Sequence, residues 1–168
     1  CLVSATLFDS KTGKVNKVDH DYFNFGYDQS KIQQTGEIAI DAIFKVESTG
    51  SKEALWEKAT SDVKLRNEEQ PLGTACSGCI FRNISPQDAI KLETPNLTTS
   101  TGYIIEKLGF KGKKIGGAQI STKHANYILN TNEATAKNVI DLINLIKDKA
   151  KNEYNLDLKE EIFLIGEF

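Results

Sequence analysis

The stretch CSGCIFRN at residues 76–83 is the most informative part of this chain. Cys76 and Cys79 form a C-x-x-C pair, which on its own is compatible with a redox dithiol or with half of a zinc site. The small residues between them favour a turn that presents Cys79, and the apolar pair Ile80-Phe81 then buries the element. This layout suits a single acidic side chain held rigidly before a substrate, so Cys79 is the first candidate for a catalytic proton donor.

The dithiol and metal interpretations of Cys76 and Cys79 stay open as weaker alternatives. A redox pair places its first cysteine at the N-terminus of a helix after a strand, whereas an apolar pair and a polar loop follow here. A structural zinc site needs four ligands, and the chain has three cysteines and two histidines, scattered along its length. An unpaired cysteine is also often a small buried apolar residue, which is the non-catalytic interpretation of Cys79.

Length and composition bound the class of protein. The 168 residues suffice for one ordinary domain or two small ones, and 39% hydrophobic with 26% charged residues is typical of a soluble globular protein. A net charge of -2 gives no basic surface for nucleic acid, and the longest apolar runs are too short to span a membrane. Three cysteines do not make a disulfide framework, so we expect a cytoplasmic protein without nucleic-acid or membrane partners.

The absence of methionine leads us to expect a piece of a longer protein. A lipidated Cys1 is the alternative, but the sequence predicts a strand directly after it. Residues 2–8 and 15–18 predict a β-hairpin, and residues 37–46 a third strand with one buried face. A helix is expected over residues 52–67, after a domain boundary near residue 48. The positions expected to face a core are Ile38, Ile40, Ala42, Phe44 and Val46 in the strand and Leu55, Trp56, Ala59 and Val63 in the helix.

The second half of the chain predicts mixed α and β structure. Polar, turn-rich residues 84–100 predict a surface insertion. The double glycine Gly116-Gly117 predicts a close approach of another backbone or a ligand, and the G-x-G-x-x-G pattern of dinucleotide sites is missing. The other expected elements are helices at 102–108 and 134–154, the latter between Asn132 and Asn155, and strands at 114–120, 125–130 and 161–165.

Three more stretches, taken together with CSGCIFRN, resemble one enzyme family. They are QPL at 70–72, LGFKGKKIGGAQISTKHANYILNTNEATAKNVIDLI at 108–143 and LKEEIFLIGE at 158–167. In this order they are similar to the C-terminal part of the UDP-N-acetylenolpyruvylglucosamine reductases, the MurB flavoenzymes of peptidoglycan synthesis. The resemblance covers most of the chain, from about residue 3 to residue 167.

The resemblance implies an α+β fold in three parts. These are the closing strands of a flavin-binding domain at 1–48, a substrate-binding domain at 49–156 and a return strand to the flavin side at 157–168. It also implies FAD and NADPH as cofactors, a UDP-sugar as substrate, a monomer and a role in building the cell wall. The glycine-rich turns that hold most of the FAD in this family are missing from the sequence, so a non-catalytic remnant that binds the UDP-sugar stays open as an alternative.

The resemblance also assigns roles to single residues. Cys79 occupies the position of the serine that protonates the substrate, in a pattern similar to G-S-x-F-K-N. Glu161 matches the carboxylic acid that supports the enolate, with Glu160 as the adjacent alternative. The positions implied to bind the substrate are Tyr27, Arg66, Asn83, Lys111 and His124. Taken alone, Lys111 is an ordinary surface lysine and His124 a histidine at a strand edge.

Two positions depart from the pattern of the family. Asp28 stands where the segment F-G-Y-R-x-S has an arginine that binds the carboxylate of the substrate, a task for a fixed cation. Lys31 is a nearby cation that could replace it. Phe163 stands where the family usually has a basic residue, which removes one expected contact to a cofactor phosphate.

Overall fold

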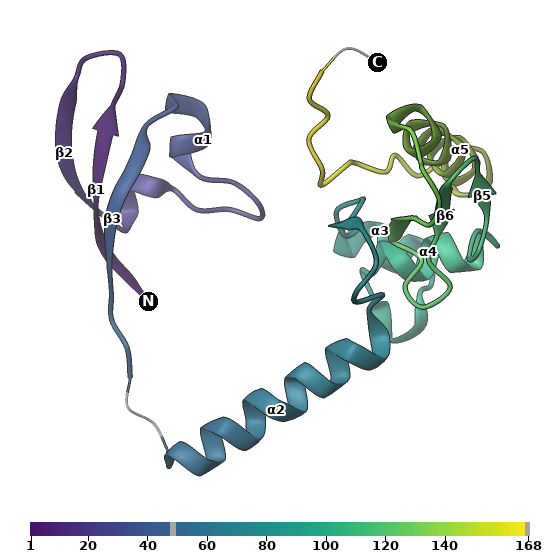
Figure 1. Ribbon diagram of the computed structural model, residues 1–168, viewed down its shortest axis with the longest axis horizontal. Helices are drawn as coiled ribbons and strands as arrows, with labels where there is room; N and C mark the ends of the chain where they lie inside the picture. Colours follow the sequence, from purple (N-terminus) through teal and green to yellow (C-terminus); the bar gives the residue numbers. More distant parts are fainter. Residues whose placement is uncertain (48–49, 167–168) are drawn as a thin grey trace. The chain divides into compact units, whose positions relative to one another are not determined.

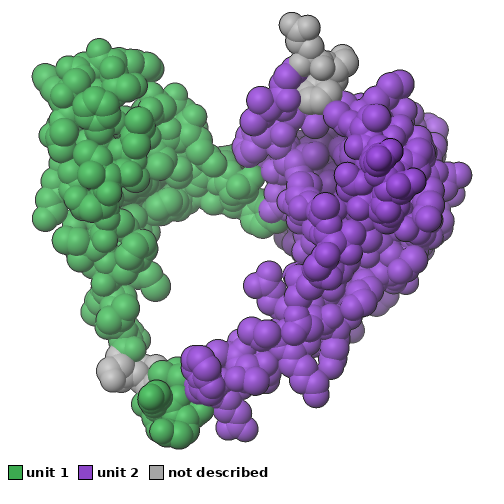
Figure 2. All heavy atoms as spheres, in the orientation of Figure 1, with its two compact units in different colours: residues 1–55 green, residues 56–168 purple. Residues whose placement is uncertain are grey.

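The computed structural model describes residues 1–47 and 50–166 and divides into two compact units. Figure 2 shows unit 1, residues 1–55, and unit 2, residues 56–168, in different colours. The division falls within helix α2 (Lys52–Glu69), which crosses from one unit into the other (Figure 1). The domain boundary expected at residue 48 lies outside the described residues.

Unit 1 is a three-stranded antiparallel sheet with the order β2-β1-β3. Its small core consists of Ala5, Leu7 and Phe23. The expected hairpin and third strand are therefore confirmed. The elements of unit 1 are β1 (Leu2–Asp9), β2 (Lys14–Asp19), the short 3-10 helix η1 (Asp21–Phe23), α1 (Lys31–Thr35) and β3 (Ile38–Phe44).

The expectation of a buried apolar face on β3 and on α2 is wrong. All seven residues of β3 are exposed, because this edge strand pairs with β1 alone and no described element of unit 1 covers it. Helix α2 buries none of its residues, and its Trp56 is 74% exposed. Leu55, Ala59 and Val63 are four residues apart and share one face of α2, but all three side chains are exposed.

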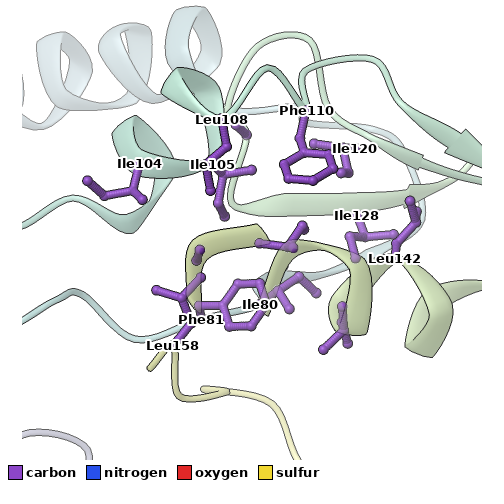
Figure 3. Packing of buried hydrophobic residues seen from close by; sticks show 14 of the residues in the cluster. Ile80, Phe81, Ile104, Ile105, Leu108, Phe110, Ile120, Ile128, Leu142 and Leu158 are labelled. Atoms are coloured by element: carbon purple, nitrogen blue, oxygen red, sulfur yellow. The ribbon is translucent and has the colours of Figure 1, made fainter. Parts of the chain in front are cut away.

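Unit 2 contains a four-stranded antiparallel sheet with the order β4-β7-β6-β5. Its helices and sheet enclose the large core in Figure 3, where Ile80 and Phe81 lie among side chains such as Ile120, Ile128 and Leu142. The α+β class expected from the sequence is confirmed. The elements are β4 (Cys76–Cys79), α3 (Pro86–Lys91), η2 (Pro95–Leu97), α4 (Thr101–Lys107), β5 (Lys114–Ile115), β6 (Ala118–Ile120), β7 (Tyr127–Asn130) and α5 (Ala136–Tyr154).

Helix α5 begins later than the sequence analysis placed it. Thr135, not Asn132, is the N-cap: its hydroxyl accepts a hydrogen bond from the Asn138 N–H, and the Asn138 side chain accepts one from the Thr135 N–H. This reciprocal pair satisfies two backbone donors that a helix start otherwise leaves open. At the other end, Asn155 closes the helix in the left-handed conformation, as expected.

Two further expectations are wrong. Residues 84–100 are not a surface insertion, because they bury Ile84, Ala89 and Thr94. The stretch forms α3 and η2, and its two prolines lie at the starts of these helices, where proline fits well. Residues 161–165 form no strand. In the described part of the C-terminal segment, ladder-type pairing is limited to an isolated bridge between Phe81 and Glu160.

Gly117 lies where two backbones nearly touch, as the double glycine predicted. A Cβ atom at Gly117 would lie 1.7 Å from the carbonyl oxygen of Asn132. The Gly117 carbonyl accepts hydrogen bonds from the N–H groups of Thr131, at 2.9 Å, and Asn132, at 3.3 Å. This contact ties the end of β7 to the turn between β5 and β6.

Candidate functional site

A β-bulge sets the direction of the Cys79 side chain. Cys76 pairs with Leu129 and Cys79 with Tyr127, so β4 uses one residue more than β7 over the same stretch. Gly78 lies inside the bulge with a φ of 87°, a left-handed conformation that glycine adopts without a steric cost. The small residues between the two cysteines therefore do shape the presentation of Cys79, within a strand rather than a free turn.

The buried side chain of Asn126 holds the chain just beyond Cys79. Its Oδ1 accepts a hydrogen bond from the Phe81 N–H at 2.9 Å, and its Nδ2 donates to the Phe81 carbonyl at 2.8 Å. The Asn126 backbone carbonyl in turn accepts from the Ile80 N–H at 2.8 Å. Three hydrogen bonds thus fix residues 80–81, with their side chains in the core.

The C-terminal segment brings Glu161 to the same place. The Glu161 N–H donates to the Ile80 carbonyl at 2.8 Å, and the Arg82 N–H donates to the Lys159 carbonyl at 2.9 Å. Cys79 and Glu161 consequently line one open hollow of about 600 Å³, together with Ser77, Ile162 and Phe163. Glu160, the adjacent alternative, instead forms an ion pair with Lys147 at 2.7 Å.

The surroundings of Cys79 keep its thiol protonated. Burial raises the pKa of Cys79 above its ordinary value of 9.0, and the charge of Glu161 raises it further. Hydrogen bonds with Tyr127 and Asn126 act in the opposite direction without cancelling this effect. Since a raised pKa favours the neutral form, the thiol carries its proton at neutral pH and can donate it.

Sequence reasoning missed Tyr127 and Asn126, the two side chains that contact Cys79. Burial also raises the pKa of the Tyr127 hydroxyl, with Cys79 as the next cause. Both residues lie at the start of the strand expected over residues 125–130, but nothing in the sequence says which strand lies beside it. Only the pairing of β4 with β7 places them against Cys79.

We expect Cys79 to react with iodoacetamide more slowly than Cys76 at pH 8. Cys76 is exposed, whereas Cys79 is partly buried and has a raised pKa, so less of it is present as the reactive thiolate. Peptide mapping by mass spectrometry after timed alkylation measures both rates in one sample. A redox dithiol requires one unusually acidic thiol, so labelling of either cysteine much faster than that of an unperturbed thiol such as glutathione would favour that interpretation.

Lys111 and His124 lie near a second hollow of about 320 Å³, which is lined by His124, Glu106 and neighbouring residues. Lys111 forms an ion pair with Glu106 at 2.8 Å. Burial lowers the pKa of His124 below its ordinary 6.5, the charge of Glu69 opposes this and that of Lys111 adds to it. His124 is therefore neutral at pH 7, as befits a hydrogen-bonding group, and its Nδ1 accepts from the Asn126 N–H at 3.3 Å.

The remaining expected site residues are exposed. Arg66 is near the C-terminal end of α2, and its charge acts to lower the pKa of Tyr127, against the effect of burial. Asn83 follows the buried Phe81. Tyr27 belongs to unit 1. Lys31, considered as a replacement cation, lies over the ring of Tyr22 at 3.9 Å.

The described residues contain neither a metal cluster nor a membrane-spanning helix. All three cysteines are free, and no group of three or more His, Cys, Asp or Glu side chains within residues 1–47 and 50–166 could hold a metal ion. No helix in this described part is long and apolar enough to cross a membrane. The metal interpretation of the C-x-x-C pair therefore has no structural support there.

Residues 70–165 match the model of the C-terminal domain of UDP-N-acetylenolpyruvoylglucosamine reductase. The chain belongs to this family. It is 36% identical to the UDP-N-acetylenolpyruvoylglucosamine reductase of Halalkalibacterium halodurans, over 92% of this chain and 47% of that protein. It is 34% identical to the enzyme of the same name from Prochlorococcus marinus, over 98% of this chain and 52% of that protein.

A solved structure agrees with the assignment. UDP-N-acetylenolpyruvylglucosamine reductase (MurB) from Thermus caldophilus superimposes on 97% of this chain with a TM-score of 0.71 and 28% identity, using 53% of its own length. The chain thus spans about half the length of the curated relatives it matches. It corresponds to the C-terminal part of a UDP-N-acetylenolpyruvoylglucosamine reductase, as the resemblance implied.

Proposed function

We propose that this chain is the substrate-protonating part of a UDP-N-acetylenolpyruvoylglucosamine reductase. The reaction would reduce the enolpyruvyl group of the UDP-sugar to give UDP-N-acetylmuramate for peptidoglycan, in the cytoplasm and with a monomeric enzyme. The observation that carries the proposal is the placement of a protonated thiol, Cys79, and a carboxyl group, Glu161, in one open hollow. The names of the relatives support the identity of the substrate.

Cys79 and Glu161 have different roles in the reduction of the double bond. When bound, FAD reduced by NADPH would supply a hydride to one carbon of the enolpyruvyl double bond. As the S–H bond of Cys79 breaks, a new C–H bond forms on the neighbouring carbon, and the thiolate then regains a proton from water. Glu161 lines the same hollow and is the group available to polarise the enolate. The hydrogen bonds at Ile80 and Phe81 hold the donor in place while this happens.

The residues around the hollow fit part of a flavin. Ile162 and Phe163 form an apolar wall beside Cys79, and Phe163 is 76% exposed, so its ring is available to a flat aromatic partner. Phe163 supplies no charge for a phosphate, and the glycine-rich turns of the family are missing from the sequence. We therefore assign to this hollow contacts with the flavin ring only.

The test uses the full-length protein and this 168-residue stretch side by side. We expect the full-length protein to show a yellow flavin band and to oxidise NADPH when the enolpyruvyl UDP-sugar is added. The stretch alone should bind FAD weakly or not at all, because it supplies only part of the flavin surface. Titration followed by visible absorbance and fluorescence quenching measures both.

Other outcomes would point to the other functions. A colourless full-length protein that binds the UDP-sugar would indicate the non-catalytic remnant. Thiol–disulfide exchange without flavin would indicate a dithiol protein using Cys76 and Cys79. Stoichiometric, tightly held FAD on the 168-residue stretch would contradict the expected division of the flavin site.

A further inference from the structure

Asn126 occupies a special place beside the proposed proton donor. It is a polar residue within the core, 2% exposed, and its side-chain amide pairs with both backbone groups of one residue by accepting from the Phe81 N–H and donating to the Phe81 carbonyl. The two partners are 45 residues apart in sequence. A buried amide destabilises the fold unless its hydrogen bonds are made. We therefore ask what these hydrogen bonds hold in place.

The hydrogen bonds around Asn126 continue to Glu161. The Asn126 backbone carbonyl accepts from the Ile80 N–H, and the Ile80 carbonyl accepts from the Glu161 N–H, both at 2.8 Å. The residue just before Ile80 is Cys79. The proton donor thus precedes the two clamped residues, 80 and 81, and the residue with the carboxyl group is hydrogen-bonded to the first of them.

We propose that Asn126 is a positioning residue for the proton transfer, which fixes the placement of Cys79 relative to Glu161 through the backbone of residues 80–81. The inference rests on the proposed function. It requires an amide, because a group that only accepts leaves the Phe81 carbonyl without its donor, and an apolar group leaves both backbone groups of Phe81 without partners. A loosened backbone at this point would misplace the donor, the kind of displacement to which proton transfer is sensitive.

The test compares three variants in the full-length protein. Asn126→Leu should lower the turnover number by about a hundredfold, with the KM for the UDP-sugar and the reduction of flavin by NADPH little changed. Thr94→Val is the matched control, because Thr94 is a buried side chain that donates to backbone carbonyls of residues 89 and 98, remote from Cys79. It should leave the turnover number near the wild-type value.

Asn126→Asp supplies a rescue experiment. The carboxylate can accept from the Phe81 N–H but repels the Phe81 carbonyl, whereas the protonated carboxyl group can also donate to it. The turnover number of this variant, relative to wild type at the same pH, should therefore recover as the pH falls. A ratio that stays low as the pH falls would mean that the hydrogen bond donated to the Phe81 carbonyl is not what positions the proton donor.

A readout that needs no activity separates this inference from the proposed function. Asn126 makes no hydrogen bond to the Glu161 amide, yet Asn126→Leu should accelerate hydrogen exchange at that amide, measured by NMR, while Thr94→Val should not. Unchanged exchange and turnover in Asn126→Leu, or equal losses in Thr94→Val, would overturn the inference. A wild-type protein without reductase activity would overturn the proposed function, and the exchange experiment would still decide whether Asn126 holds Glu161.

Discussion

Cys79→Ala should slow the turnover of the enolpyruvyl substrate by about a hundredfold or more, the usual cost of losing a general acid. Alanine has no proton to give, while the reduction of flavin by NADPH does not involve Cys79 and should stay largely intact. Cys79→Ser should retain much more activity, since the hydroxyl is again a proton donor. Stopped-flow measurement of the two half-reactions separates the effects.

The pH dependence gives the same prediction a second readout. Because burial raises the pKa of Cys79 above 9.0, the wild-type thiol stays protonated through neutral pH. The rate should therefore fall only as the pH rises through this raised pKa. In Cys79→Ser this alkaline limb should disappear, because serine does not titrate there. Cys76→Ala is the matched control, one exposed thiol removed from the same strand. If it proves as damaging as Cys79→Ala, the dithiol interpretation is the better one.

Gly117→Ala should strongly destabilise unit 2. A Cβ atom at 1.7 Å from the Asn132 carbonyl oxygen meets backbone, which cannot rotate away, so the chain must move and weaken the hydrogen bonds that Thr131 and Asn132 donate to Gly117. We expect a loss of about 3 kcal/mol or more in the free energy of unfolding. For a unit of this size that corresponds to a Tm lowered by roughly 10 to 20 °C, measured by circular dichroism.

Gly73→Ala is the control for this substitution. Gly73 has a φ of 81° and nothing within 4 Å of its added Cβ, so it tests backbone strain without a clash. Its cost should be about 1 kcal/mol. Equal losses for the two variants would mean that the contact between the backbones of residues 117 and 132 is not what constrains this turn.

The sequence predicted best where a local pattern is strong. The hairpin of unit 1 follows from the alternation of apolar and polar residues, and helix α5 follows from apolar residues spaced three and four apart. Both patterns can be read without knowledge of distant residues. The exposure of β3 and α2 could not be predicted, because burial depends on what covers an element, and no described element of unit 1 covers β3. Prolines at 86 and 95 suggested turns, although they stand at helix starts.

In the candidate site, too, local sequence patterns could be predicted and contacts between distant residues could not. Cys79 and Glu161 were identified through the resemblance of their stretches to the reductase family, and the structure places both in one hollow. Asn126 and Tyr127 were missed because their importance comes from strand pairing across 45 residues, which no local pattern contains. The substrate-binding roles that the family implies remain predictions for three exposed residues, Tyr27, Arg66 and Asn83.

The bulge in β4 makes the candidate site depend on the number of residues as well as on their identity. Paired residues on neighbouring strands face the same side, and Leu129 and Tyr127, two apart on β7, share one face of the sheet. Cys76 and Cys79 therefore share that face although they are three apart, a spacing that puts side chains on opposite faces of a regular strand. Without the bulge, the same spacing would put Cys79 on the face opposite Cys76 and turn its thiol away from Glu161. In the evolution of such a protein, selection would therefore retain Gly78, whose left-handed conformation permits the bulge, even where substitutions at Ser77 are tolerated.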